Sequence, residues 1–223
     1  MDYSDWARKN KKRVARELIR KLDVASSEHP SGIFTAGLPG AGKTEFTVEL
    51  LKEIIGSPLR IDMDEIATLI EGYRPEIANK FRLGASMILG RIYDETVKNK
   101  IDFVFDGTFG HERAIENVER ALKQKYTVKV YFIHQDPALA WGFTKDRELI
   151  ERRSINKESF LGTYSSLFEN IRTLQNSYKN VTISIVVKDK QNKIGQRFEN
   201  VDDIFSIIPK PLARDELERV ILE

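Results

Sequence analysis

The chain of 223 residues lacks cysteine, which excludes disulfides and thiolate metal sites. It also lacks any apolar run near the ~18 residues that a membrane-spanning helix needs, and no secretory apolar segment follows the basic N-terminus. Its net charge of +2, from 36 Lys and Arg against 34 Asp and Glu, gives no overall field for holding duplex nucleic acid. We therefore expect a cytoplasmic protein with no membrane span and no duplex nucleic-acid partner.

Short apolar runs alternate with helix-like stretches from residue 33 onward. Alternation of this kind predicts right-handed βαβ units and a mainly parallel sheet. The expected strands are Ile33–Ala36, Leu59–Ile61, Phe103–Phe105, Val128–Ile133 and Val181–Val187. The helix-like stretches between them start near Lys43, Glu76, Glu112 and Pro137, and a last charged helix starts at Arg214.

The two ends of the chain depart from this alternation. Residues 1–31 contain a basic amphipathic helix from Tyr3 to Val24, which we expect to pack on or beside a domain formed by residues 32–223. Its basic face is either a solvated surface or a contact for an acidic partner. After the last apolar strand, Lys193–Phe198 predicts the second strand of a C-terminal β-hairpin.

A phosphate-binding motif follows the first strand. Gly37–Thr44 matches G-x-x-x-x-G-K-[ST] in full, between an apolar strand and an amphipathic helix. Glycines let backbone N–H groups surround phosphate oxygens, Lys43 would reach the β- and γ-phosphates, and Thr44 would ligate Mg²⁺. The predicted nucleotide-binding residues are Gly37, Pro39, Gly40, Ala41, Gly42, Lys43, Thr44 and Glu45. The fold class that follows is a three-layer α/β P-loop NTPase or kinase fold with an N-terminal helix and a C-terminal β-hairpin.

Two acidic residues follow the second strand. If the backbone stays extended through Asp64, Asp62 and Asp64 leave the same side of the strand and face the phosphate loop. One carboxylate would then accept the proton of an attacking hydroxyl while the other orients Mg²⁺ through water, and Asp62 is also a candidate substrate contact. The alternative for Asp62 is a helix cap, since Glu65 stands three residues later.

Asp106 ends the third apolar strand, as the acidic residue of a Walker B strand does, and Gly107 and Thr108 follow it. A carboxylate at this position holds Mg²⁺ or a substrate hydroxyl, and Thr108 would hydrogen-bond to the substrate. The alternative is an ordinary turn built from Asp and Gly.

Arg147 and Arg153 lie in a stretch with a helix, a break and a new helix. Guanidinium groups there would stabilise γ-phosphate charge in the transition state. The competing interpretation is surface pairing, for example of Arg147 with Glu151 at i,i+4.

Asn99-Lys100-Ile101-Asp102 matches the N-K-x-D guanine motif of GTPases. That motif should leave a strand at the ligand edge, whereas here it enters one. A signalling GTPase is therefore disfavoured.

Taken together, these motifs resemble the zeta toxin family of P-loop kinases, from Ile33 to Phe198. The resemblance implies ATP and Mg²⁺ as cofactors, Asp64 as proton acceptor, Asp106 and Thr108 as substrate contacts, and Arg147 and Arg153 as phosphate-stabilising arginines. It implies phosphorylation of the 3′-hydroxyl of UDP-N-acetylglucosamine and inhibition by a small helical antitoxin.

The sequence departs from this family's pattern where the acceptor is recognised. Asp106 stands where the family pattern has a glutamate, and the arginine that the pattern places two residues after Thr108 is absent. We assign the role of that missing arginine to Arg113. We therefore expect a kinase that transfers the ATP γ-phosphate to a hydroxyl of a small nucleotide-type acceptor, with a sugar nucleotide favoured. The alternatives are a P-loop kinase for a dinucleotide, an antibiotic or a polynucleotide end, and a non-kinase NTP-dependent regulatory protein.

Overall fold

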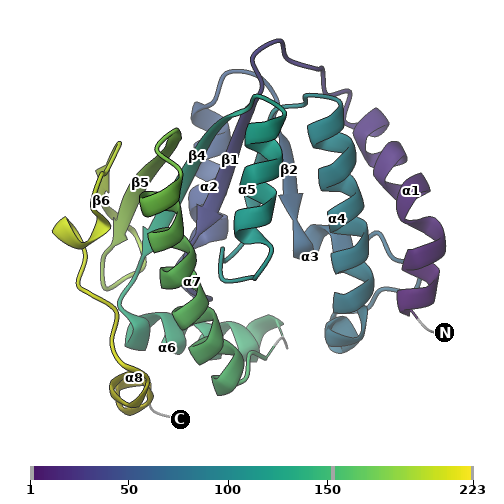
Figure 1. Cartoon of the computed structure of the whole chain (residues 1–223). Coiled ribbons are helices and arrows are strands. Elements are labelled where there is room, and N and C mark those ends of the chain that lie inside the picture. The colour runs from purple at the N-terminus through teal and green to yellow at the C-terminus, as the bar shows by residue number, and fades with distance from the viewer. Residues whose placement is uncertain (1–2, 152–153, 222–223) are drawn as a thin grey trace.

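The computed structural model describes residues 3–151 and 154–221 of the chain. They form one six-stranded sheet with helices on both faces (Figure 1). The strands are β1 (Ser31–Ala36), β2 (Leu59–Asp62), β3 (Phe103–Asp106), β4 (Thr127–His134), β5 (Val181–Lys188) and β6 (Ile194–Phe198). The α-helices are α1 (Tyr3–Lys21), α2 (Lys43–Glu53), α3 (Met63–Ala67), α4 (Arg82–Lys98), α5 (Ala114–Lys123), α6 (Pro137–Glu151), α7 (Lys157–Ser177) and α8 (Arg214–Val220), and the 3₁₀ helices are η1 (Pro75–Phe81) and η2 (Ile204–Ser206).

The strand order is β2-β3-β1-β4-β5-β6, and every pairing is parallel except that of β5 with β6. The α/β class, the mainly parallel sheet and the C-terminal hairpin predicted from the sequence are therefore confirmed. Strands buried on both faces need nearly continuous apolar runs, and β4 supplies one from Val130 to Ile133. Parallel strands share one carboxyl edge, so the loops that follow β1, β2, β3 and β4 meet there.

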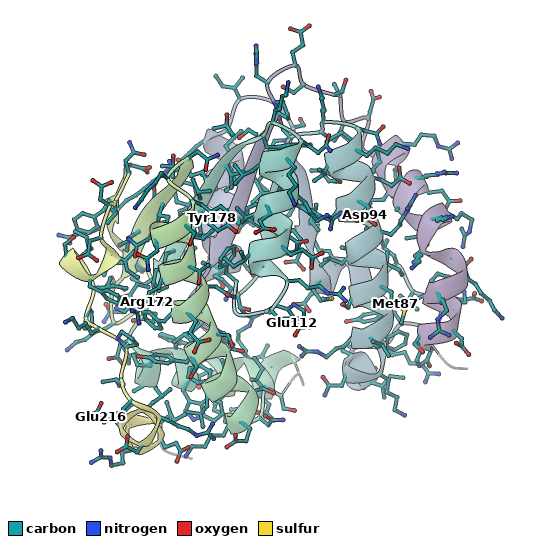
Figure 2. The ribbon with its side chains drawn as sticks, in the orientation of Figure 1. Met87, Asp94, Glu112, Arg172, Tyr178 and Glu216 are labelled. Atoms are coloured by element: carbon teal, nitrogen blue, oxygen red, sulfur yellow. The ribbon has the colours of Figure 1, made fainter. Side chains whose placement is uncertain are left out.

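Helices cover both faces of this sheet. Figure 1 shows α4, α5 and α7 in front of the sheet and α2 behind it. Helix α7 faces the sheet with a buried stripe at helical spacing, which includes Leu167, Ile171 and Leu174. Figure 2 labels Asp94 and Tyr178, which lie on either side of α5: Asp94 pairs with Arg120, and the Tyr178 hydroxyl donates to Glu119.

The predicted N-terminal helix is α1, which ends at Lys21 and packs along α4 at the end of the helical layer (Figure 1). Gly84 allows the close approach, because a Cβ there would lie 2.9 Å from the carbonyl oxygen of Tyr3. The Tyr3 ring also stacks on Phe81 at a centroid distance of 3.9 Å. The division of the chain after residue 31 stays a prediction.

Candidate active site

The phosphate loop has the strand–loop–helix setting that its motif requires, since it joins β1 to α2. Gly40 and Gly42 have φ of +78° and +75°, and Gly42 is the N-cap residue of α2. A Cβ on Gly40 would lie 2.1 Å from the carbonyl oxygen of Ala140 in α6. Only glycine fits at this position, because any side chain would push the loop and α6 apart.

Lys43 begins α2 and is partly buried. Its Nζ donates a 2.7 Å hydrogen bond to the carbonyl oxygen of Leu38, within the loop itself. Burial lowers the pKa of Lys43 to about 8, with Arg147 contributing to the fall and Asp106 and Asp62 opposing it. Asp62, Asp106 and Arg147 therefore lie within electrostatic range of this ammonium, from the ends of β2 and β3 and from α6.

Arg60 connects the acidic residues at the carboxyl edge, and no motif in the sequence predicted a role for it. Its Nη2 donates to Asp106 Oδ2 at 2.7 Å and to Asp62 Oδ2 at 3.1 Å, while Nη1 donates to Glu65 Oε1 at 2.7 Å. Asp62 and Asp106 are register partners on β2 and β3. Two carboxylates so close need a cation between them, and the guanidinium supplies it.

Thr35 fixes the other oxygen of Asp106, and it too was missed. Its hydroxyl lies 3.2 Å from Asp106 Oδ1 and 3.0 Å from the carbonyl oxygen of Gly107, and it accepts the Gly107 N–H at 2.9 Å. The side chain of Asp106 is 3 % exposed. A polar residue inside a buried apolar strand was the signal available in the sequence for Thr35.

The extended geometry expected for Asp62 and Asp64 is not found. Strand β2 ends at Asp62, whose Oδ1 accepts the backbone N–H of Asp64 at 2.7 Å and of Glu65 at 3.0 Å, so α3 begins directly after it. The capping alternative for Asp62 is thus confirmed, and Asp64 lies exposed in the first turn of α3. Burial raises the pKa of Asp62, and the negative charges of Asp106 and Asp64 add to the rise.

Thr108 lies beside the phosphate loop, because its carbonyl oxygen accepts the N–H of Gly37 at 3.0 Å. The loop continues to α5, and Asn170 of α7 holds it by donating to the carbonyl oxygen of Phe109 at 2.8 Å. Arg113 stands at the start of α5 with an exposed side chain. Figure 2 shows the neighbouring Glu112 in this loop, at the end of α5 nearest α3 and α6.

The two predicted arginines have different outcomes. Arg147 lies on α6, the helix that contacts Gly40 through Ala140, and its charge acts on Lys43. Arg153 lies outside the described residues. The N-K-x-D sequence is at the opposite edge of the sheet, as expected, where Asp102 accepts the N–H of Ser31 at 2.7 Å.

A second set of residues missed by the sequence analysis comes from the turn between β5 and β6. Asn192 donates to the carbonyl oxygen of Gly40 at 3.2 Å, and Gln135 at the end of β4 donates to the carbonyl oxygen of Asp189 at 2.8 Å. The hairpin turn therefore packs directly on the phosphate loop. The signal for this turn in the sequence was Lys188, a charged residue at the end of an apolar run.

The donor set fits Mg²⁺ bound together with phosphate. Among the described residues, no group of three His, Asp or Glu side chains forms a metal site. Mg²⁺ commonly binds through one or two protein oxygens, several waters and substrate phosphates. Thr44 is exposed in the first turn of α2, and the Asp106 carboxylate keeps acceptor capacity beyond the bonds from Arg60 and Thr35.

The comparison with solved structures supports the fold. The chain is similar to a structure described under the PezAT chromosomal toxin–antitoxin system of Streptococcus pneumoniae, with a TM-score of 0.67 and 17% identity over 100% of this chain and 90% of that one. It is also similar to the AvrRxo1-ORF1:-ORF2 structure with ATP, with a TM-score of 0.59 and 13% identity over 87% of this chain and 63% of that one.

A more distant likeness is to the Pnkp1/Rnl/Hen1 RNA repair complex, with a TM-score of 0.50 and 11% identity over 79% of this chain and 50% of that one. At these identities the likenesses show the fold alone. No curated protein matches the chain.

The family model described as zeta toxin matches residues 15–197, which runs from inside α1 to the end of the hairpin. This match covers the phosphate loop, the acidic edge and Arg147. None of the helices formed by residues 3–151 and 154–221 has the length and apolar character to cross a bilayer. The chain belongs to the zeta toxin family, with the P-loop kinase fold.

Proposed function

We propose that this chain is a cytoplasmic kinase that transfers the γ-phosphate of ATP to a hydroxyl of a small nucleotide-type acceptor, with a sugar nucleotide such as UDP-N-acetylglucosamine favoured. One observation carries the proposal. Lys43 of the phosphate loop lies within electrostatic range of the carboxylates Asp62 and Asp106 and of the guanidinium of Arg147. Phosphoryl transfer needs these charges around one phosphate: cations for its oxygens, and acidic groups for the acceptor and the metal.

Each residue has a distinct role in this proposal. The backbone from Gly37 to Glu45 holds the phosphates, and Lys43 and Arg147 neutralise the charge that develops during transfer. Asp64, exposed in the first turn of α3, accepts the proton of the acceptor hydroxyl. Thr44 and Asp106 would hold Mg²⁺, which would supply positive charge to the phosphate oxygens.

The acceptor would bind on the β2–β3 side of the phosphate loop. Asp62, Asp106 and Thr108 lie there, and Arg113 stands at the far end of the same β3–α5 loop. The similar structure described under a toxin–antitoxin system also supports a partner, and we propose a small helical antitoxin for this chain.

Purified protein incubated with Mg-ATP and a panel of UDP-sugars, dinucleotides, antibiotics and oligonucleotide ends tests the proposal. A gain of one phosphate on one acceptor, scored by mass, is the expected result. Asp64→Asn should lower the rate by at least ~100-fold with ATP affinity unchanged. Asp202→Asn, which removes an exposed carboxylate remote from the loop, is the matched control.

No product on any acceptor, with slow loss of ATP, would overturn the kinase proposal and favour a nucleotide-dependent regulator. Equal rates for the wild type and Asp64→Asn would remove Asp64 from the mechanism.

A further inference from the structure

Lys188 ends β5 at a register shift in its pairing with β6, and its side chain reaches the phosphate loop. A Cβ placed on Gly42 would lie 2.9 Å from Lys188 Cε and 3.0 Å from its Nζ. The residue is only 8% exposed. A second lysine, distant in sequence from the motif, therefore lies against the loop that carries Lys43.

The Lys188 ammonium has acidic residues around it but none bonded to it. Within residues 3–151 and 154–221 it makes no hydrogen bond and no ion pair. Burial lowers the pKa of Lys188, while Glu45 and Glu49 of α2 and the adjacent Asp189 act against the fall. Partial desolvation of an ammonium with no bonded partner is unfavourable, and an anion bound beside it would relieve that free energy.

The surrounding turn holds this lysine in place. Asn192 donates to the carbonyl oxygen of Gly40 at 3.2 Å, and its Oδ1 would lie 3.0 Å from a Cβ on Gly42. Gln135 donates to the carbonyl oxygen of Asp189 at 2.8 Å. The turn that follows Lys188 is thus held against the phosphate loop before any ligand binds, which lowers the entropy lost on binding.

The strand order decides which phosphates this lysine can meet. Strands β2 and β3, with Asp62 and Asp106, lie on one side of β1, and β5 with Lys188 lies on the other side. The transferred phosphate must lie near the acidic side, where the acceptor is deprotonated. Lys188 therefore faces the part of the phosphate chain that is not transferred.

We infer that Lys188 is a second nucleotide-binding lysine, whose ammonium binds the α- and β-phosphate oxygens of the bound nucleoside polyphosphate. This inference rests on the proposed nucleotide-binding function. It assigns to the β5–β6 turn a direct part in ligand binding, beyond its packing on the loop.

The test compares Lys188→Met with Lys190→Met, which removes the same charge from an exposed position in the same turn. Titration calorimetry with Mg-ADP and with Mg-ATP should show that Lys188→Met weakens both by a similar factor, about tenfold or more, because both ligands contain the α- and β-phosphates. Lys190→Met should bind both within about twofold of the wild type. The kcat measured at saturating substrate should change less than the KM for ATP.

Urea unfolding of the ligand-free variants separates this role from a structural one. Lys188→Met should raise the unfolding midpoint, because it replaces a partly desolvated charge that has no bonded partner with an apolar chain, even as nucleotide affinity falls. Lys188→Gln, which keeps polarity without charge, provides a second variant, expected to weaken both nucleotides similarly.

Nucleotide affinities unchanged within twofold in both Lys188 variants, while the wild type binds, would overturn this inference and leave the proposed function standing. Weakened affinity together with a lowered midpoint would assign Lys188 a structural role and also overturn it. If the wild type binds neither nucleotide, the proposed function fails and this inference fails with it.

Discussion

Arg60 Nη2 lies 2.7 Å from Asp106 Oδ2, and the same nitrogen reaches Asp62, so one guanidinium joins the ends of two neighbouring strands. The side chains of Arg60 and Asp106 are 17% and 3% exposed. Breaking an ion pair at this depth leaves a carboxylate without its cation. We expect Arg60→Met to lower the free energy of unfolding by about 2–4 kcal/mol, measured by urea denaturation.

A double-mutant cycle isolates the Arg60–Asp106 pair. Asp106→Asn alone removes the charge that the guanidinium neutralises, so the double variant should lose less stability than the sum of the two single losses. Simple additivity would show that the two side chains contribute independently.

Asp62 combines two structural roles, since it caps α3 and accepts from Arg60. We expect Asp62→Ala to lower the free energy of unfolding by about 1–2 kcal/mol. Asp203→Ala is the matched control, because Asp203 caps η2 with one bond to the N–H of Phe205 and is exposed. Equal losses for the two variants would mean that the Arg60–Asp62 pair adds nothing to the cap.

The sequence predicted where the candidate site residues follow the strands, because the end of each apolar run marks the end of a strand. Asp106 and the phosphate loop were found in this way. The role of Arg60 could not be predicted, since it depends on β3 lying beside β2, in a register that places Asp106 opposite Asp62. The contact of Lys188 with Gly42 likewise requires the hairpin turn to fold over a loop distant in sequence.

Helix α3 was predicted only as the alternative to an extended strand, for a local reason. Its signal is the single capping residue Asp62, and the sequence read equally well as an extended continuation of β2. The capping hydrogen bonds decide between these alternatives, and they place Asp64 in the first turn of a helix instead of on an extended strand. Patterns of apolar residues say little about so short a helix, which has only Ile66 and Ala67 buried.

Gly40 tests the contact between the phosphate loop and α6. Gly40→Ala places a methyl group 2.1 Å from the carbonyl oxygen of Ala140, at a φ of +78°. We expect it to lower the free energy of unfolding by more than about 1 kcal/mol and to weaken nucleotide binding, measured by urea denaturation and calorimetry.

The control is Gly142→Ala in α6, where an added Cβ would have no atom within 4 Å. This helical, exposed position should gain about 0.5–1 kcal/mol of stability. A Gly40→Ala protein as stable as the wild type would show that the loop and α6 separate at little cost.

Glu199 predicts a pH dependence of stability. Partial burial opposes its ionisation, but hydrogen bonds from Lys129, Ser184 and Arg197 lower its pKa to about 2. A carboxyl whose pKa falls on folding stabilises the fold above its ordinary value near 4.5, and this contribution is lost as the pH falls toward 2. Glu199→Gln should therefore be less stable than the wild type at neutral pH.

The difference in urea midpoint between the wild type and Glu199→Gln should narrow at about pH 3, because much of the stability that ionised Glu199 contributes is lost there. Glu112→Gln, at an exposed carboxylate in the β3–α5 loop, should show no such convergence. A gap for Glu199→Gln that stays constant with pH would assign its effect to packing instead of charge.

Thr47 predicts a gain in stability from removing a polar atom. It is fully buried in α2, and within the described residues its Oγ1 has no hydrogen-bond partner. Thr47→Val keeps the shape of the side chain and removes the unsatisfied hydroxyl, so the free energy of unfolding should rise by about 1 kcal/mol. Thr96→Val is the matched control, because Thr96 is also fully buried in a helix but donates to the carbonyl oxygen of Ile92 at 2.8 Å. Urea denaturation should show no gain for Thr96→Val, and equal gains for both variants would refute the role assigned to the unsatisfied hydroxyl.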